Sequence, residues 1–198
     1  MSTEVAYVVP VVILAGGKSR RMGRDKLDLM LGGQTLLEYA VSRFEADFND
    51  VYISVSDESR YPKIASRRVV DALPGAGPLS GLHAALKTLQ CDGVFLVAAD
   101  LPFAGVTAAR RIIEFGKDRE ACVIKLPDGN LEPLFAYYAR SLLPICEKLI
   151  SSGDNRMTGL YKSTDTRFVS VEELGDAWDE KLIYNVNFPD DYEKLMQE

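Results

Sequence analysis

Residues 7–26 read YVVPVVILAGGKSRRMGRDK, an apolar run that leads through two glycines into a basic stretch. The run 7–14 is β-branched and almost wholly apolar, which is typical of a central strand covered on both faces. Glycine lets a backbone approach an anion closely, so the residues after Leu14 favour a phosphate-binding loop. Five basic side chains then fall within nine residues: Lys18, Arg20, Arg21, Arg24 and Lys26.

The basic stretch matches neither of the two common glycine-rich phosphate motifs. It has no GxxxxGK[ST] spacing, and it has no GxGxxG directly before a helix. Arginine pairs with phosphate oxygens through its planar fork, and lysine acts as a compact point charge, so a triphosphate would suit the segment. The alternative interpretation is a solvated basic loop between a strand and a helix.

Composition limits the class of protein. The chain has 198 residues, 47% of them hydrophobic and 26% charged, which is typical of a globular domain. A net charge of −6 argues against a general nucleic-acid binder. The N-terminus does not resemble a signal peptide, no run is long enough to span a membrane, and the three cysteines lack CxxC spacing. We therefore expect a cytoplasmic protein with no membrane partner.

The rest of the chain alternates between strand and helix patterns, which predicts an α/β fold with a parallel sheet between two helical layers. A PDGN turn between two strand-like runs predicts a hairpin, and so a mixed sheet toward the C-terminus. We expect strands at 7–14, 51–55, 68–70, 94–100, 121–126, 131–139, 167–171 and 182–188. We expect helices at 35–46, up to residue 89, at 105–115, at 141–151 and from residue 189.

Polar residues follow three of the expected strands. In parallel α/β sheets, ligands bind beyond the carboxyl ends of the strands. The loop after Leu14, Asp71 after the third strand and Asp100 after the fourth are therefore candidate site positions. A single aspartate at a strand end suits Mg²⁺, which keeps most of its water ligands. Asp71 and Asp100 also fit a purely structural role as caps of the Pro-containing turns that follow them.

Five segments, taken together, resemble one enzyme family. LAGGKSRRMGRDK (14–26) resembles the signature of the GT-A-like nucleotidyltransferases that activate molybdopterin, above all the molybdenum cofactor guanylyltransferases. The other four segments follow in the family's order and extend to residue 192. They are DALPGAGPLSGLHAAL (71–86), VAADLPF (97–103), EPLFAYY (132–138) and YNVNFPDDY (184–192).

The resemblance implies a fold, a reaction and a division of the chain. The fold would be the three-layer αβα, Rossmann-like nucleotidyltransferase fold with a mostly parallel mixed sheet, in one domain over residues 1–198. The reaction would transfer GMP from GTP to the phosphate of molybdenum-bound molybdopterin and release pyrophosphate, with Mg²⁺ as cofactor. Residues of about 7–104 would bind the nucleotide, and residues 105–198 would form the molybdopterin side. Molybdopterin insertion and molybdenum-handling proteins would be its protein partners.

The resemblance also assigns roles to individual residues. Arg21, Lys26 and Asp100 would be catalytic, with Asp100 holding the metal and the two cations holding the triphosphate. The nucleotide would lie against Leu14, Ala15, Gly16, Gly17, Lys26, Ser54, Asp71 and Asp100. Ser54 stands where many family members have asparagine, which leaves its contact with the nucleotide open. Asn185 and Asn187 would lie on the molybdopterin side, sharing one strand face because they are two residues apart. Two turn-forming asparagines are the alternative.

Other functions are also compatible with these residues. Related cytidylyltransferases tend to have LAAG and DxDTP where this chain has LAGG and NVN, so GTP is favoured over CTP. A nucleotidyltransferase acting on another small phosphate, such as a sugar 1-phosphate, would share the first loop and the metal aspartate. A non-catalytic nucleotide-binding adaptor is the third interpretation, and the joint presence of Arg21, Lys26 and Asp100 argues against it.

Overall fold

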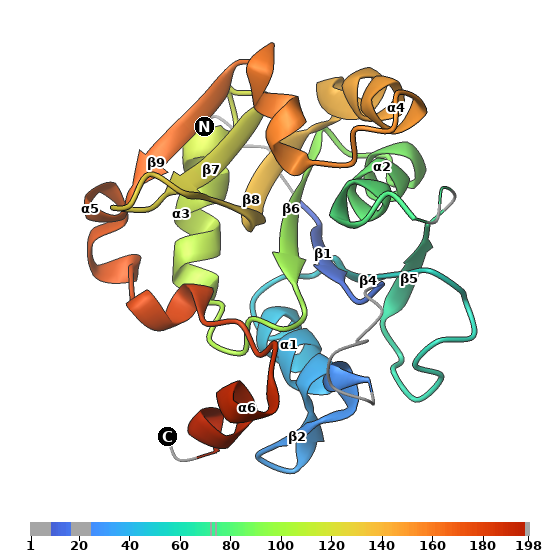
Figure 1. Ribbon diagram of the computed structural model, residues 1–198, viewed down its shortest axis with the longest axis vertical. Coiled ribbons are helices and arrows are strands. Elements are labelled where there is room, and N and C mark those ends of the chain that lie inside the picture. The colour runs from blue at the N-terminus through green and yellow to red at the C-terminus, as the bar shows by residue number, and fades with distance from the viewer. Residues whose placement is uncertain (1–8, 17–24, 72, 74, 197–198) are drawn as a thin grey trace, which may run out of the picture.

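A computed structural model describes residues 9–16, 25–71, 73 and 75–196, and these form a three-layer α/β structure around one seven-stranded sheet (Figure 1). The strand order is β5-β4-β1-β6-β8-β7-β9. The pairs β5–β4, β4–β1, β1–β6 and β7–β9 are parallel, whereas β8 is antiparallel to both of its neighbours. The predicted α/β fold with a mostly parallel mixed sheet is confirmed.

The bounds of the elements are as follows. The strands are β1 Val11–Leu14, β2 Met30–Leu31, β3 Gln34–Thr35, β4 Val51–Val55, β5 Arg67–Val70, β6 Gly93–Ala98, β7 Ala121–Lys125, β8 Leu131–Ala139 and β9 Thr166–Ser170. The α-helices are α1 Leu36–Glu45, α2 Pro78–Thr88, α3 Val106–Gly116, α4 Leu143–Ser151, α5 Val171–Leu174 and α6 Pro189–Leu195. The 3-10 helices are η1 Lys26–Asp28, η2 Arg140–Leu142, η3 Met157–Lys162, η4 Gly175–Ala177 and η5 Glu180–Ile183.

The central strands are apolar throughout because both faces of the sheet are covered. In β1, Val11 and Ile13 point into a core shared with α1 and α3, whereas Val12 points into a second core shared with α2 and α4. Strand β6 alternates in the same way. At about 25 cal/mol per Å² of apolar surface removed from water, these two cores supply most of the drive to fold. They also fix β1 and β6 as the rigid base on which the site stands.

Local sequence signals set where the helices begin. Thr35 caps α1 by accepting a hydrogen bond from the backbone N–H of Glu38 at 3.2 Å, and Glu38 accepts one in return from the N–H of Thr35 at 2.8 Å. This capping box satisfies two backbone donors that the helix leaves unpaired. Helix α2 begins at Pro78, whose missing N–H costs nothing at the first helical position. The helix expected at 35–46 is therefore confirmed as α1, with Thr35 as its N-cap.

The expected strand at 182–188 is wrong. This segment begins in the 3-10 helix η5 and continues without regular structure to α6. Its backbone donors do not pair with a strand: the N–H of Val186 donates to the carbonyl oxygen of Asp100, and those of Asn187 and Phe188 donate to the Asp191 carboxylate. The alternating apolar residues pack elsewhere, with Val186 in a small core that also contains Leu29.

The C-terminal segment therefore returns to the N-terminal half of the protein. Figure 1 shows α6 beside the hairpin of β2 and β3 and close to α1. Leu195 of α6 packs with Leu36 of α1, and the Tyr192 hydroxyl donates to the carbonyl oxygen of Met30 at 2.6 Å. The β2–β3 hairpin turns at Gly32 and Gly33, whose φ values of 59° and 88° favour glycine. Within the described residues, no helix is both long and apolar enough to span a bilayer.

Candidate active site

The carboxyl ends of three neighbouring parallel strands form the floor of the candidate site. In the sheet register, Leu14 at the end of β1 lies opposite Ser54 of β4 and Ala98 of β6. The strand ends are tied together where they leave the sheet, because the Ala15 N–H donates to the Ser54 carbonyl oxygen at 2.8 Å. The Ala99 N–H likewise donates to the Leu14 carbonyl oxygen at 3.2 Å. Asp100, one residue further, therefore stands at the same edge as the loop after Leu14.

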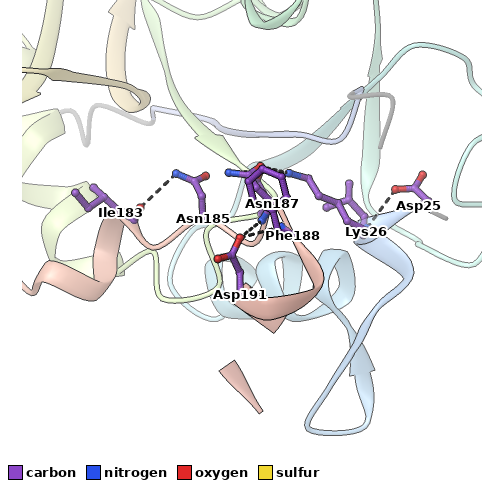
Figure 2. A network of polar contacts seen from close by, with 9 residues as sticks. Asp25, Lys26, Ile183, Asn185, Asn187, Phe188 and Asp191 are labelled. Atoms are coloured by element: carbon purple, nitrogen blue, oxygen red, sulfur yellow. Dashed lines mark hydrogen bonds and ion pairs between the residues drawn. The ribbon is translucent and has the colours of Figure 1, made fainter. Parts of the chain in front are cut away.

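Lys26, Asp100 and Asn187 meet at this edge from three distant parts of the chain. The Lys26 ammonium forms an ion pair with the Asp100 carboxylate and donates to the side-chain oxygen of Asn187 at 2.9 Å. Figure 2 shows Lys26 and Asn187 directed toward each other. The Lys26 and Asp100 side chains are only 18% and 17% exposed, so solvent screens their charges less than those of a surface pair.

The backbone around Lys26 is fixed by Asp25. The Asp25 carboxylate accepts a hydrogen bond from the Leu27 N–H at 3.2 Å and so caps η1, the short helix that begins with Lys26. Leu27 is buried in the larger core, which anchors η1 on the body of the protein. The Lys26 side chain therefore extends from an anchored turn toward Asp100 rather than from an unsupported loop.

Asn187 is held in place by the first turn of α6. The Asp191 carboxylate accepts hydrogen bonds from the backbone N–H groups of Asn187 and Phe188 at 2.9 Å and 2.8 Å (Figure 2). Asn185 makes a different contact, since its side-chain amide donates to the carbonyl oxygen of Ile183 at 3.3 Å. Because residues 184–188 are not a strand, the expected shared strand face of Asn185 and Asn187 does not exist. Of the two, Asn187 is the one that reaches Lys26.

A second polar group lies on the β4–β5 side of the floor. The buried Ser54 hydroxyl donates to the Asp71 carboxylate at 2.9 Å. Burial raises the pKa of the Asp71 carboxyl, and this hydrogen bond opposes the shift. A Cβ atom added to Gly16 would lie 3.3 Å from the second Asp71 oxygen, so Gly16 leaves the backbone open beside that carboxylate. Gly16, Ser54 and Asp71, to which the family resemblance assigns contacts with the nucleotide, therefore lie together.

Helix α2 closes this side of the floor through Gly81. A Cβ atom there would lie 2.5 Å from a Leu14 methyl carbon and 2.7 Å from the Ser54 hydroxyl oxygen, both closer than side-chain carbons approach other atoms. A side chain at position 81 would force Leu14 and Ser54 to move, so glycine lets α2 pack closely on the ends of β1 and β4 while Ser54 keeps its contact with Asp71.

Sequence reasoning missed Glu132, which lies close to Asp100. Strand β8 pairs with β6 with Val97 opposite Phe135, and continuing this register brings Glu132 level with Asp100. Burial raises the pKa of the Glu132 carboxyl, a hydrogen bond from the Leu134 N–H lowers it, and the nearby Asp100 charge raises it. The sequence predicted the hairpin of β7 and β8 but not the antiparallel pairing of β8 with β6, which is what brings this residue to the site.

Some of the expected site residues cannot be placed. Gly17 and Arg21 lie outside the described residues, as do Lys18, Arg20 and Arg24. The predicted roles of Gly17 and Arg21 therefore remain predictions. The nearest described positions on either side are Gly16, beside Asp71, and Asp25, beside Lys26. The described chain thus ends at Gly16 on one side of this stretch and resumes at Asp25, directly before the lysine that contacts Asp100.

The donor groups around Asp100 fit a divalent metal that brings most of its own ligands. Among the described residues no set of three or more His, Cys, Asp or Glu side chains could enclose a metal ion. Asp100 offers a half-buried carboxylate, and Asn187 offers an amide oxygen beside it. Both are hard oxygen donors of the kind that Mg²⁺ accepts while retaining water or phosphate oxygens. The residues present therefore fit a magnesium ion held jointly by protein and substrate.

Comparisons with known proteins all point to the same protein family. A family model described as "MobA-like NTP transferase domain" matches residues 11–168. A probable molybdenum cofactor guanylyltransferase from Carboxydothermus hydrogenoformans is 32% identical over 94% of each chain. A second, from Pelotomaculum thermopropionicum, is 33% identical over 92% of this chain and 89% of its own. The crystal structure of molybdopterin-guanine dinucleotide biosynthesis protein A from Archaeoglobus fulgidus superposes with a TM-score of 0.85, at 26% identity, over 96% of this chain and 97% of its own.

Proposed function

The chain belongs to the MobA-like NTP transferase family and is a nucleotidyltransferase, and on that premise we propose that it transfers GMP from GTP to the terminal phosphate of molybdopterin, with or without bound molybdenum. The product is the guanine dinucleotide form of the molybdenum cofactor, and pyrophosphate leaves. The observation that carries the proposal is the meeting of Lys26, Asp100 and Asn187 beside the end of β1. The names of the relatives support the choice of substrates.

The proposed reaction exchanges one phosphoanhydride linkage for another. An oxygen of the molybdopterin phosphate attacks the α-phosphorus of GTP in line with the bond to the bridging oxygen, which breaks to release pyrophosphate. The second pKa of a phosphate monoester is about 6. At neutral pH the attacking oxygen is therefore mostly unprotonated, and no base is needed to remove a proton from it. The protein's task is therefore to align the two phosphates and to offset negative charge.

Lys26 supplies the positive charge for this step. Its ammonium lies at the edge of the sheet where the strand ends meet, and it is oriented by Asp100 on one side and by Asn187 on the other. In the proposed complex it donates to triphosphate oxygens and stabilises the charge that develops at the α-phosphorus. Because its charge is already placed before substrate binds, little reorganisation is needed during the reaction.

Asp100 and Asn187 would hold the magnesium ion. A bound Mg²⁺ would supply positive charge that offsets part of the negative charge on the phosphates. Asp100 suits this role because its carboxylate stands at the end of the buried strand β6, whose position is fixed by both cores. Asn187 brings the C-terminal segment to the same point, so the molybdopterin side of the chain and the nucleotide side meet here. Asn185 stays assigned to molybdopterin on the family pattern.

Gly16, Ser54 and Asp71 would bind the nucleoside. Asp71 uses one carboxylate oxygen for the Ser54 hydroxyl, and its other oxygen lies beside Gly16. Guanine presents two adjacent N–H donors on its pairing edge, whereas cytosine presents an amino donor next to an acceptor nitrogen. A carboxylate accepts hydrogen bonds only, so it suits guanine better. A cytidylyltransferase activity is the main alternative, followed by transfer to another small phosphate.

We expect pyrophosphate release to require GTP, molybdopterin and Mg²⁺ together. The assay measures initial rates of pyrophosphate formation with GTP, CTP, ATP or UTP at equal concentration. GTP is expected to be preferred over CTP by at least about a hundredfold, because leaving the half-buried Asp71 carboxylate unpaired against cytosine is costly. Omission of molybdopterin reports hydrolysis of the nucleotide alone and serves as the control.

Three other outcomes of this assay would separate the alternatives. A preference for CTP would identify a cytidylyltransferase. Pyrophosphate release with a sugar phosphate but not with molybdopterin would identify a different acceptor. GTP binding without pyrophosphate release from any acceptor would indicate a non-catalytic nucleotide-binding protein, and any of the three would overturn the proposal.

A further inference from the structure

An ion pair and a tyrosine hydroxyl join Asp25 to the loop between β4 and β5. The Asp25 carboxylate oxygen that does not cap η1 forms an ion pair with Arg60 and accepts a hydrogen bond from the Tyr61 hydroxyl at 2.8 Å. Arg60 also donates to the Tyr61 hydroxyl at 2.7 Å. The three side chains therefore form a closed set of contacts, which we call the Asp25 clamp, defined as Asp25, Arg60 and Tyr61.

The Asp25 clamp also reaches the end of β1. The Tyr61 hydroxyl lies 3.3 Å from the carbonyl oxygen of Ala15, the residue directly after β1. Tyr61 thus contacts both Ala15 and Asp25, which lie on either side of the basic segment in the sequence. One phenol group therefore links the end of β1 to the residue that precedes Lys26.

The backbone at Tyr61 is unusual in a way that serves this contact. Its φ angle is 54°, the only positive value at a non-glycine residue in the described part of the chain. This left-handed conformation is disfavoured for residues with a side chain, so the surroundings must hold it. Arg68 does so by donating to the carbonyl oxygens of Tyr61 and Ile64 at 2.8 Å and 2.9 Å, and the Tyr61 ring packs against the larger core.

The Tyr61 hydroxyl is suited to act as a permanent hydrogen-bond donor. Burial and the hydrogen bond to Asp25 raise the pKa of Tyr61 well above its usual range. The hydroxyl therefore keeps its proton at any physiological pH and donates to the carboxylate. Hydrogen bonds to a charged group are stronger than those between neutral groups, so this contact restrains Asp25 more firmly than a neutral pair would.

We propose that Tyr61, together with Arg60, is a positioning residue that sets the location of Lys26 by holding Asp25 against the end of β1. The inference rests on the proposed function in one respect, namely that Lys26 acts on the triphosphate. Lys26 follows Asp25 directly and spans from it to Asp100 and Asn187. Loosening Asp25 would let the ammonium move away from the reacting phosphates while the substrates still bind.

The chain offers a matched control for the test. Arg67, Tyr52 and Asp50 form a trio of the same residue types on the outer part of the sheet, in which Arg67 donates to Asp50 at 2.6 Å and to the Tyr52 hydroxyl at 3.0 Å. Tyr52→Phe therefore removes the same hydroxyl from the same kind of trio, away from Lys26. Tyr61→Phe keeps the ring and removes the hydroxyl with its contacts to Asp25, Arg60 and Ala15.

Tyr61→Phe is expected to lower kcat by about tenfold and to change KM for GTP by less than about threefold, whereas Tyr52→Phe should change neither. The decisive comparison repeats Tyr61→Phe in a Lys26→Ala background under single-turnover conditions. If Tyr61 acts through Lys26, the second substitution adds no further loss. Unchanged kcat in Tyr61→Phe, or an equal loss in both backgrounds, would overturn the proposal.

Hydrogen exchange gives a readout that does not depend on catalysis. The Leu27 N–H is capped by Asp25, so its exchange is expected to speed up by about tenfold in Tyr61→Phe and to stay unchanged in Tyr52→Phe. If the wild-type protein does not transfer GMP, the proposed function fails, and exchange alone then decides the positioning role. Unaltered exchange at Leu27 would reject it. Should Tyr61→Phe fail to fold, Asp25→Asn weakens the same contact from its other side, and full activity in that variant would likewise reject it.

Discussion

Asp100→Ala is expected to lower the rate of guanylyl transfer by about a thousandfold or more, because it removes both the carboxylate that would bind magnesium and the group that orients Lys26. The fold should survive the change. The backbone carbonyl oxygen of Asp100 accepts a hydrogen bond from the Val186 N–H at 3.1 Å, and alanine keeps that carbonyl. The measurement is the single-turnover rate at increasing Mg²⁺ concentration.

Asp92→Ala is the matched control for this variant. Asp92 directly precedes β6, at the opposite end of the strand from Asp100, so the change removes the same charge far from the strand ends that form the site. It should leave the rate unchanged. Saturating activity of Asp100→Ala at raised Mg²⁺ would show that another group holds the ion. Wild-type activity at ordinary Mg²⁺ would refute the assignment altogether.

Lys26→Ala is expected to lower kcat by about a hundredfold to a thousandfold while raising KM for GTP by much less. The reason is that charge at the α-phosphorus grows only as the reaction proceeds, so the ammonium contributes more to the transition state than to the bound substrate. Steady-state kinetics over a range of GTP concentrations separate the two effects. Circular dichroism and thermal unfolding check that the variant is folded.

Two further variants sharpen the Lys26 test. Lys87→Ala removes an exposed lysine of α2 whose nearest carboxylate, Glu147, is 3.6 Å away, and it should have no effect on the rate. Lys26→Arg keeps the charge, but its planar fork cannot occupy the same point between Asp100 and Asn187, so we expect only partial activity. A rise in KM equal to the fall in kcat/KM, with kcat unchanged, would mean that Lys26 binds GTP without assisting transfer.

The parts of the fold that follow from local chemistry could be predicted from the sequence. The apolar runs of β1 and β6 are explained by a sheet covered on both faces, and the Thr35–Glu38 pair marks the start of α1. The β2–β3 hairpin was missed because its strands are only two residues long. Such short elements carry too little periodicity to distinguish them from a loop.

The C-terminal segment shows why a correct periodicity can give a wrong element. Leu182, Tyr184 and Val186 alternate with other residues as in a strand. The segment nevertheless pairs with neither edge of the sheet, because β5 and β9 are its outermost strands. The segment instead crosses the strand ends, and its backbone donors pair with the Asp100 carbonyl oxygen and the Asp191 side chain. An alternating pattern indicates that every second side chain is buried, but it does not identify the element that covers those side chains.

The candidate site was predictable where it depends on strand ends and was not predictable where it depends on long-range packing. Asp100 follows the buried strand β6, and parallel topology alone brings it to the loop after Leu14. The contact of Lys26 with Asn187 joins residues 161 positions apart, and it depends on the path of the C-terminal segment. The Asp25 clamp depends on a left-handed residue in a loop, for which Tyr61 gives no sequence signal.

The most direct test of guanylyl transfer is the mass of the product. The purified protein is incubated with GTP, Mg²⁺ and molybdopterin, and the pterin product is analysed by mass spectrometry after the protein is removed. We expect a molybdopterin that has gained one GMP unit through a new phosphate–phosphate linkage, with one pyrophosphate released for each molecule formed. Unmodified molybdopterin recovered after GTP has been consumed, or a pterin that carries CMP when CTP is supplied alongside, would contradict it.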